Sequence, residues 1–444
     1  MAVREGRLGD WVRRRLGDRF SPSPPVPQSP SRLIIAVTFL VATVAVMRAE
    51  DPLRLPVGDP ARKGREVSVV LDGITDAAAG TVITPAELPA RLSGVRLLLV
   101  GEEHTAMESH RVERRVLEEL ANAGRRVLIG LEMYPYVEQP SLDLWTGGKL
   151  AEKDFLAQSH WYKNWGYNWG YYRDIFLLAG ERQMPMFAIN TPREVVAAVR
   201  KKGFSGLTEE EAAHVPARID TDSPDHLRLF KALLGDEGMH SGMSDADWKG
   251  MFEAQCTWDA TMAQNAAAAL KKHAGDEKAI LVVLVGGGHV AYGLGIQRQA
   301  ARLVSGRIAT LIPVAVRDEK NKAVGVVAAS YADFVWGVAP ERDTLFPGLG
   351  VSTRPAEGGK GLSIIHVEKK SVAEKAGLAL GDVFVTMDGT GVEDRETLNR
   401  LIAEKKWGDS ARLVLRRGAN TVNVTAYFRR EPSAEDPPPS KKES

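Results

Sequence analysis

Two short apolar runs of this chain end in the same pattern of glycine and histidine. Residues 96–100 (RLLLV) lead into GEEH, which ends at His104, and residues 280–285 (ILVVLV) lead into GGGH, which ends at His289. Continuous runs of Val, Ile and Leu bounded by glycine are typical of central strands in a parallel sheet that is covered on both faces. Ligands of such sheets bind beyond the carboxyl ends of the strands. We therefore expect the two histidines to meet at one edge of a sheet.

Two further predicted strands also end in polar residues. Glu132 and Tyr134 follow the end of one strand, and Asn190 follows another. Imidazole and carboxylate groups that converge in a pocket bind zinc, manganese or iron, or carry out acid–base chemistry. The pattern predicts a metal site made of His104, Glu132 and His289. The alternative is that these residues are ordinary turn and capping residues at strand ends.

His110 is a further candidate ligand, six residues after His104. On one continuous helix the two rings would lie about 240° apart and would not share a face. His110 therefore joins the site only if the helix begins after Thr105. Otherwise it is a surface histidine.

An aromatic segment at residues 160–172 contains three tryptophans and four tyrosines. Trp161, Trp165 and Trp169 recur every four positions, which would give one aromatic face on a helix, although the two glycines within the segment weaken helix formation. Such a face would cover a flat apolar ligand such as a porphyrin, with a tyrosine or histidine as iron ligand. The alternative is a lid that packs on its own core.

A long predicted helix carries two polar residues within an apolar stripe. Gln255 and Asp259, four positions apart, lie among residues that should face the core. Because buried polar groups need partners, we expect them to hold a site histidine in place. The alternative is a helix edge at which both side chains reach water.

The order of apolar and helical segments predicts the fold. It indicates an α/β domain at residues 65–339, with a mainly parallel sheet flanked by helices, and a small β-rich domain at residues 345–430. Residues 431–444 should form a disordered tail. The expected strands are 95–100, 127–131, 186–189, 280–285 and 307–312, and the expected helices are 109–123, 173–181, 192–201 and 247–272.

The N-terminal residues indicate export. Residues 1–32 are basic and rich in proline and serine, with seven arginines against three acids, and residues 33–47 are apolar apart from two threonines. We expect residues 33–49 to be a signal peptide or a signal anchor in the inner membrane, followed by a linker at residues 50–64. The protein would then be periplasmic, either cleaved or anchored.

The cysteine content and the net charge exclude further classes of protein. The single cysteine, Cys256, excludes an internal disulfide, and no cysteine follows the apolar run to accept a lipid. A formal net charge of +1 gives no basic surface for nucleic acid.

These motifs, in this order, resemble the ChaN-like haem-binding uptake family of the Tiki superfamily. The resemblance spans roughly residues 66–315 and includes both histidine motifs, the aromatic segment, Glu132 and the stripe around Asp259. It implies an exported protein that binds haem for iron acquisition. Relatives in the wider superfamily are metal-dependent proteases with paired Gly-x-x-His motifs, or erythromycin esterases.

The C-terminal domain resembles a bacterial PDZ domain of the HtrA type. The sequence AGLALGDV at residues 376–383, followed by MDG at 387–389, carries the resemblance. It implies that Leu349, Gly350 and Val351 form the loop that takes a peptide's terminal carboxylate, while the peptide adds as an edge strand. The partners would be protein C-termini.

Three functions remain open at this stage. The first is binding of haem, or of another small apolar ligand, by His104, His289 or a tyrosine, and a flat cofactor of this kind could be shared within a homo-oligomer. The second is a metal-dependent hydrolase with Glu102 or Glu103 as general base. Against it, the chain has no His-Glu-x-x-His or Gly-x-Ser-x-Gly motif. The third is a PDZ scaffold in which the α/β domain is inert.

Overall fold

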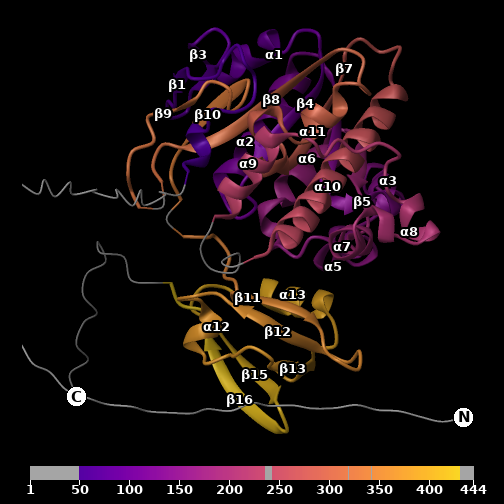
Figure 1. The fold of residues 1–444 in the computed structure, drawn as a ribbon, viewed down its shortest axis with the longest axis vertical. Coiled ribbons are helices and arrows are strands. Elements are labelled where there is room, and N and C mark those ends of the chain that lie inside the picture. Colours follow the sequence, from indigo (N-terminus) through magenta and orange to yellow (C-terminus); the bar gives the residue numbers. More distant parts are fainter. Residues whose placement is uncertain (1–49, 236–242, 319, 342, 431–444) are drawn as a thin grey trace, which may run out of the picture. The chain divides into compact units, whose positions relative to one another are not determined.

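An eight-stranded sheet forms the centre of the α/β domain in a computed structural model that describes residues 50–235, 243–318, 320–341 and 343–430 (Figure 1). Its strand order is β3-β2-β10-β8-β4-β7-β5-β6. Strands β10, β8, β4, β7, β5 and β6 run parallel, whereas β2 and β3 add antiparallel to one edge. The prediction of a mainly parallel sheet flanked by helices is confirmed.

The strands of this domain are β1 (Glu66–Ser68), β2 (Ile74–Asp76), β3 (Thr81–Ile83), β4 (Val95–Glu102), β5 (Arg126–Pro135), β6 (Met186–Asn190), β7 (Ala279–Gly286), β8 (Arg307–Ala315), β9 (Val326–Ala328) and β10 (Phe334–Val338). The helices are α1 (Leu88–Arg91), α2 (Met107–Asn122), α3 (Gln139–Thr146), α4 (Glu152–Gln158), α5 (Trp161–Asn164), α6 (Arg173–Glu181), α7 (Arg193–Lys202), α8 (Glu209–Ala213), α9 (Pro224–Leu234), α10 (Asp245–Lys271) and α11 (Ile296–Ala300). Each expected strand and helix has a counterpart here, whereas the additions are helices α1, α3, α4, α5, α8, α9 and α11 and strands β1, β2, β3, β9 and β10.

The register of the central strands aligns the two histidine motifs. Strands β4 and β7 are neighbours, and Glu102 at the end of β4 lies opposite Gly286 at the end of β7. Every residue of β7 is buried, as expected for a strand covered on both faces. His104 and His289 therefore leave the sheet at the same edge.

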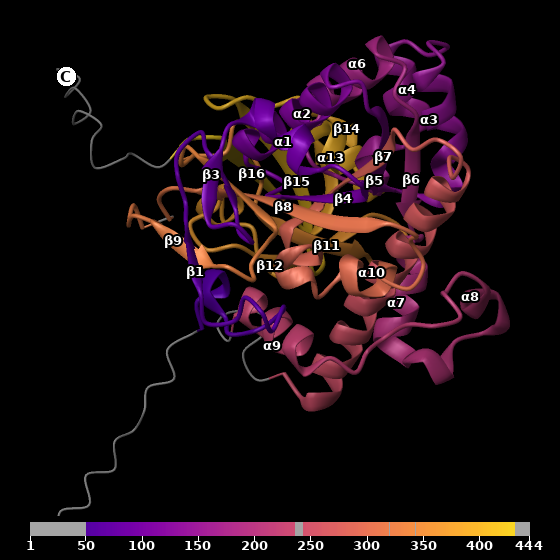
Figure 2. The same cartoon turned by 90° about the horizontal axis from the view of Figure 1, so that it is seen from above.

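Two hydrophobic cores lie on the two faces of the sheet. Alternate strand residues such as Leu98 and Val282 pack with α2, α6 and the aromatic segment, whereas Leu97 and Leu281 pack with α10 and α11. Figure 2 shows α2 and α6 on one side of the sheet and α10 on the other. Because side chains alternate between the faces of a strand, the continuous apolar runs supply both cores.

The beginning of α2 decides the position of His110. The helix begins at Met107, after Thr105, so the chain turns between His104 and the helix. His110 then lies in the first turn of α2 and is buried. The condition for bringing it near His104 is met.

The aromatic segment is not one helix. Helix α5 ends at Asn164, and the chain turns at Gly166, whose φ of +89° favours glycine. Trp161 and Trp169 are buried in the core, with ring centroids 4.9 Å apart, whereas Trp165 is half-buried. The tryptophans therefore form two groups and not one aromatic face, because Gly166 interrupts the helix. Trp161 and Trp169 form one group in the core, and the half-buried Trp165 is the other.

The segment at residues 50–64, predicted to be a linker, packs on the α/β domain. Leu55 and Val57 are buried, and the Leu55 amide donates to the Tyr292 hydroxyl over 2.8 Å. Residues 1–32, the predicted signal peptide or anchor at 33–49 and the tail at 431–444 lie outside the described residues. No helix among the described residues is long and apolar enough to cross a membrane.

The C-terminal domain is a separate antiparallel sheet with strand order β11-β12-β13-β15-β16, to which β14 adds. Its elements are β11 (Val351–Pro355), β12 (Leu362–Val367), α12 (Val372–Lys375), β13 (Val383–Met387), β14 (Thr390–Gly391), α13 (Arg395–Ala403), β15 (Ser410–Arg417) and β16 (Asn420–Tyr427). It has its own hydrophobic core, which includes Phe384 and Phe428. The predicted small β-rich domain is confirmed.

Replacing Trp161 by alanine should lower the free energy of unfolding of the α/β domain by about 3–5 kcal/mol, because the ring is fully buried and its loss leaves a cavity. Denaturant unfolding followed by circular dichroism measures this change. Trp165→Ala is the matched control and should cost less, since that ring is half-buried. Equal losses in the two variants would contradict the division of the aromatic segment.

Candidate functional site

His104 is held by the carboxylate two residues before it. Its Nδ1 lies 2.7 Å from Glu102 Oε1, and the Tyr172 hydroxyl donates to the same oxygen over 2.8 Å. With Nδ1 occupied in this way, Nε2 is the ring atom available to a ligand. Gly286 makes this ring position possible, because a Cβ there would lie 2.9 Å from His104 Cε1.

His289 is held in a similar way from the other face of the sheet. Its Nδ1 lies 2.6 Å from Asp259 Oδ1, and the Gln255 amide is 2.9 Å from the same nitrogen. Both partners come from α10, four residues apart, so one helical face positions the ring. The sequence predicted that Gln255 and Asp259 hold a site histidine in place, and both side chains contact His289.

Glu132 lies between the two histidine motifs. Its Oε1 is 3.4 Å from His289 Nε2, and its Oε2 accepts the Gly286 amide over 2.7 Å. One ligand atom from each of Glu102, His104 and Glu132 lies within 4.8 Å of the others. Glu132 thus lies near both His104 and His289, but the three-ligand cluster contains Glu102 in the place predicted for His289.

Asn190 supports this arrangement from β6. Its side-chain amide donates to the Glu132 backbone oxygen over 2.9 Å, and its carbonyl oxygen accepts the Thr191 amide over 2.8 Å. Its amide oxygen is thus bonded to the neighbouring backbone. Asn190 acts on the backbone around the site.

A buried cluster of charge lies behind His104. His110 Nδ1 is 3.1 Å from Glu102 Oε2 and 2.9 Å from Glu113 Oε2, and its Nε2 is 3.2 Å from the His104 backbone oxygen. Burial alone would lower the pKa of His110, but Glu102 and Glu113 raise it to about 10. Burial and the charge of Glu102 raise the pKa of Glu113 well above its usual value.

Glu102 is ionised within this cluster. Burial alone would raise the pKa of its carboxyl group, but His110 and His104 hold that pKa well below its usual value. Its oxygens face His104, Tyr172 and His110, so Glu102 is a positioning carboxylate and not a free base. Glu103, by contrast, is exposed.

Two carboxylates bracket His289. Burial alone would lower the pKa of the ring, but Asp259 and Glu132 raise it to about 10. Burial would likewise raise the pKa of Glu132, and the neighbouring histidines lower it. Near neutral pH the pair is therefore ionic.

An aromatic-walled cavity of about 390 Å³ opens in front of these groups. Trp165 and Tyr167 contact the His104 ring, with centroid distances of 4.8 and 5.0 Å, and Trp258 lies 6.3 Å from the His289 ring. The volume lies within the range of small-molecule sites. The cavity also includes Lys163 and Arg193, two cationic side chains.

A second cavity of about 420 Å³ shares His104 and His289 with the first. It also includes Glu103, and its other wall comes from α9, with Leu229, Phe230 and Leu233. The two histidines thus lie between an aromatic space and an aliphatic one.

Besides Asp259, four of the predicted haem-site residues line neither cavity. Trp161 and Trp169 are core residues, and Tyr134 is buried with its hydroxyl 2.8 Å from Ser159 Oγ. His110 lies behind Glu102. Their burial in the core places these four side chains behind the walls of both cavities.

Several site residues were not singled out from the sequence. Tyr167 and Tyr172 belong to the aromatic segment, whose composition predicted a tyrosine at the site without identifying which one. Glu113 lies one helical turn after His110, a spacing that signals a paired side chain. His226 lies in α9, with its Nε2 3.6 Å from Asp259 Oδ2, and it has no such signal because α9 was not predicted.

The predicted carboxylate loop of the C-terminal domain has a fixed backbone. Gly350 has φ +77°, and a Cβ there would lie 2.3 Å from Ser371 Cβ, so the position requires glycine. The Leu349 oxygen accepts the Ala373 amide over 2.8 Å. The loop leads through Val351 into β11, the edge strand of its sheet.

Comparisons with known proteins agree with both domains. Residues 88–299 match the family described as haem-binding uptake, Tiki superfamily, ChaN, and residues 347–427 match the PDZ domain. These matches confirm the two resemblances noted from the sequence. The chain thus contains a domain similar to the ChaN family over residues 88–299, followed by a domain similar to PDZ domains over residues 347–427.

Similar proteins include one curated sequence and several solved structures. A probable periplasmic serine endoprotease, DegP-like, from Halomonas elongata is 28% identical over 251 residues, which are 52% of this chain and 50% of that protein. The chain thus spans about half the length of this relative. A structure of cofacial haem binding to ChaN of Campylobacter jejuni is 15% identical, covers 59% of this chain and 95% of that one, and has a TM-score of 0.46. The HtrA3 PDZ domain bound to a phage-derived ligand is 18% identical, covers 18% of this chain and 82% of that one, and has a TM-score of 0.17.

Replacing Asp259 by asparagine should lower the pKa of His289 from about 10 towards its ordinary value, because one of its two carboxylate partners loses its charge. The folded pKa lies above the unfolded value of about 6.5, so the ion pairs of His289 stabilise the fold fully below that pH. Their contribution is lost as the pH rises through about 10. An NMR titration of the imidazole resonances measures the pKa, and an unchanged value in the variant would contradict the role given to Asp259.

Proposed function

We propose that this chain, which joins a ChaN-like haem-binding domain to a PDZ domain, is an exported protein that binds haem in the aromatic-walled cavity and serves haem or iron uptake. The observation that carries the proposal is His104, whose Nδ1 is bound to Glu102 while its ring contacts Trp165 and Tyr167 at the cavity wall. Histidine and tyrosine are both common axial ligands of haem iron.

The donor set and the walls fit haem. His104 and Tyr167 supply an imidazole nitrogen and a phenol oxygen beside a flat aromatic surface, which suits the face of a porphyrin. Lys163 and Arg193 supply positive charge for the carboxylates that a haem carries at its edge. Bound haem would supply an iron centre, and His104, Tyr167 or His289 would hold it.

The PDZ domain would bind protein C-termini. The backbone of the loop at Leu349, Gly350 and Val351 would take the terminal carboxylate, and the peptide would add to β11 as a further strand. The carboxylate needs donors from the backbone, and the edge strand leaves one side of β11 for pairing. We infer that this domain recruits a protein partner to the haem site.

Export rests on two observations. The basic N-terminus followed by an apolar run is typical of an export signal. The curated relative is named as periplasmic. The proposal therefore includes a periplasmic location. The protein would be either cleaved after the signal or anchored by it.

A metal-dependent hydrolase is a second candidate, favoured by the convergence of His104, Glu132 and His289. Two histidines and a carboxylate form a common site for a divalent ion, and buried carboxylates behind the histidines are typical partners of such ligands. Glu102 is fully buried between His104, Tyr172 and His110, so the general base in such a reaction would be another group, such as Glu103. In this candidate the PDZ domain would deliver protein C-termini for cleavage.

Replacing His104 by alanine should weaken haem binding by the purified full chain at least tenfold and shift the Soret band, because the iron loses a ligand held by Glu102. Absorbance titration with haem measures both effects. Tyr167→Phe keeps the ring and removes the phenol, so a Soret shift in this variant alone would make Tyr167 the ligand instead.

The control is His273→Ala, a histidine located between α10 and the start of β7, at the opposite end of the sheet. Elemental analysis of the same chain before haem is added separates the two candidates. The absence of a saturable Soret shift, together with stoichiometric zinc, manganese or iron that is lost in Glu132→Ala, would overturn haem binding in favour of the hydrolase.

For the PDZ domain, the probe is the peptide FGRWV, which is the phage-derived ligand of the HtrA3 PDZ domain. With a free carboxylate it should bind the full chain about ten times more tightly than with a C-terminal amide. The amide removes the charge that the loop amides would bind, a loss of about 1.4 kcal/mol. Fluorescence anisotropy of the labelled peptides measures both affinities. Equal binding of the two forms would exclude carboxylate recognition.

A further inference from the structure

Each cavity histidine has a second, buried histidine behind it, and a carboxylate lies between the two rings. Glu102 Oε1 is 2.7 Å from Nδ1 of His104, and Glu102 Oε2 is 3.1 Å from Nδ1 of His110. The side chain of Glu102 has no exposed surface, and that of His110 is 1% exposed. The order is therefore cavity histidine, buried carboxylate, buried histidine.

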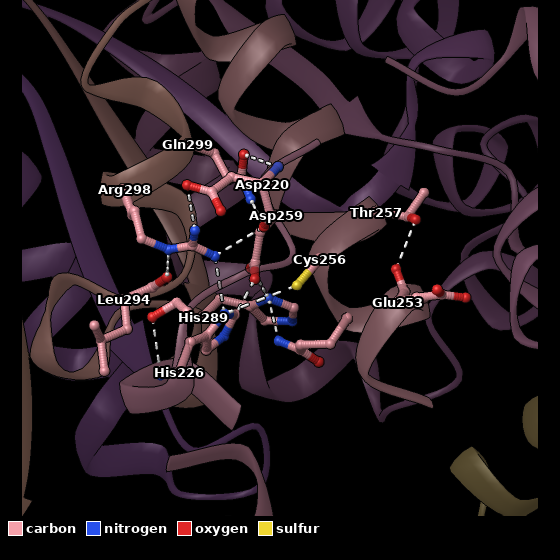
Figure 3. Close-up of polar contacts among 12 residues, drawn as sticks. Asp220, His226, Glu253, Cys256, Thr257, Asp259, His289, Leu294, Arg298 and Gln299 are labelled. Carbon is pink, nitrogen blue, oxygen red and sulfur yellow. Dashed lines mark hydrogen bonds and ion pairs between the residues drawn. The ribbon is translucent and has the colours of Figure 1, made fainter. Parts of the chain in front are cut away.

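The same order occurs on the other face of the sheet (Figure 3). Asp259 Oδ1 is 2.6 Å from His289 Nδ1, and Asp259 Oδ2 is 3.6 Å from His226 Nε2. Here too the carboxylate has no exposed surface and the rear histidine is 1% exposed. The two arrangements come from different elements, β4 and α2 in one case, α9 and α10 in the other.

In each arrangement the rear histidine faces the second carboxylate oxygen. Across the described ranges, neither Glu102 Oε2 nor Asp259 Oδ2 makes a hydrogen bond of good geometry, although both atoms are buried. A buried carboxylate oxygen without a nearby positive or donor group is costly. His110 and His226 are the groups that face these two oxygens.

The rear histidines are themselves anchored. The His110 ring is fixed by Glu113 and by the His104 backbone oxygen. The His226 Nδ1 lies 3.2 Å from an Arg298 nitrogen, and Arg298 forms an ion pair of 2.6 Å with Asp220. Figure 3 shows Asp259, His226, Arg298 and Asp220 in one connected group. Neither ring can turn without breaking these contacts.

We propose that His110 and His226 are positioning residues, which hold Glu102 and Asp259 so that these carboxylates fix the ring orientation of His104 and His289. The proposal rests on the proposed function in making the cavity a binding site, since both fixed rings line it. His104 and His289, the front histidines, belong to the two Gly-x-x-His motifs of the sequence. His110 and His226, the rear histidines, belong to helices that begin outside those motifs. Loss of one rear histidine should therefore disturb only the front histidine that shares its carboxylate.

The experiment is NMR of the ligand-free full chain with ¹⁵N-labelled histidine. Imidazole N–H protons bound to carboxylates give low-field resonances, and His104→Ala and His289→Ala assign them. We expect His226→Leu to shift or abolish the His289 resonance and to leave that of His104 unchanged. His226→Gln keeps a donor for Asp259 and should restore the resonance. His110→Leu should affect the His104 resonance alone.

Haem titration of the same variants gives the second readout. If haem binds as proposed, His226→Leu or His110→Leu should weaken binding about tenfold, the typical loss when a partner of a ligand residue is removed. His273→Gln is the matched control and should change neither readout. Circular dichroism verifies that each variant is folded.

The outcomes separate this proposal from the proposed function. Unchanged front-histidine resonances in folded His226→Leu and His110→Leu would overturn the positioning role, whatever the haem affinity. The expected NMR changes in a chain that binds no haem would support the positioning role and reject haem binding. A shift of both front histidines in every variant would mean a general loss of packing, and it would also overturn the proposal.

Discussion

The site depends on the burial of ionised carboxylates at the end of a parallel sheet. Glu102 and Asp259 have no exposed side-chain surface, and Glu132 is largely buried. An isolated buried charge would cost several kcal/mol, so each of these groups must have positive or hydrogen-bonding neighbours. The histidines, Tyr172 and the Gly286 amide meet that need. The site histidines are thus oriented by the need of the buried carboxylates for positive or hydrogen-bonding neighbours.

Adjacent strands make this compensation possible. Strands β4 and β7 are neighbours in register, so two separate Gly-x-x-His motifs end side by side. Gly286 leaves the space that the His104 ring occupies. Each histidine then receives its carboxylate from a different face, Glu102 from its own strand and Asp259 from α10. The site joins two hydrophobic cores that are otherwise separated by the sheet.

Much of the sheet and part of the site could be predicted from the sequence. Apolar runs bounded by glycine identified the strands around His104 and His289, because strands buried on both faces have a strong local signal. The four-residue spacing of Gln255 and Asp259 similarly placed both side chains on one helical face. The four-residue spacing of the tryptophans did not produce one helical face, because the chain turns at Gly166, between Trp161 and Trp169.

The remaining site residues could not be identified from local pattern. His226 reaches Asp259 only through the packing of α9 on α10, which no periodicity of either segment encodes. Tyr167 and Tyr172 lie five residues apart in a segment full of aromatic residues, and only the folded chain distinguishes the one that contacts His104 from the one that binds Glu102. Long-range packing decides such cases.

The position of Cys256 has a consequence for studying motion in this protein. The thiol is fully buried beside His226 and among Phe230 and Phe252, and burial raises its pKa. A thiol reagent can therefore react only when α9 and α10 separate, and the chain contains no other cysteine. The rate at which the natural chain is labelled therefore measures the opening of that helix pair, and the measurement requires no introduced probe.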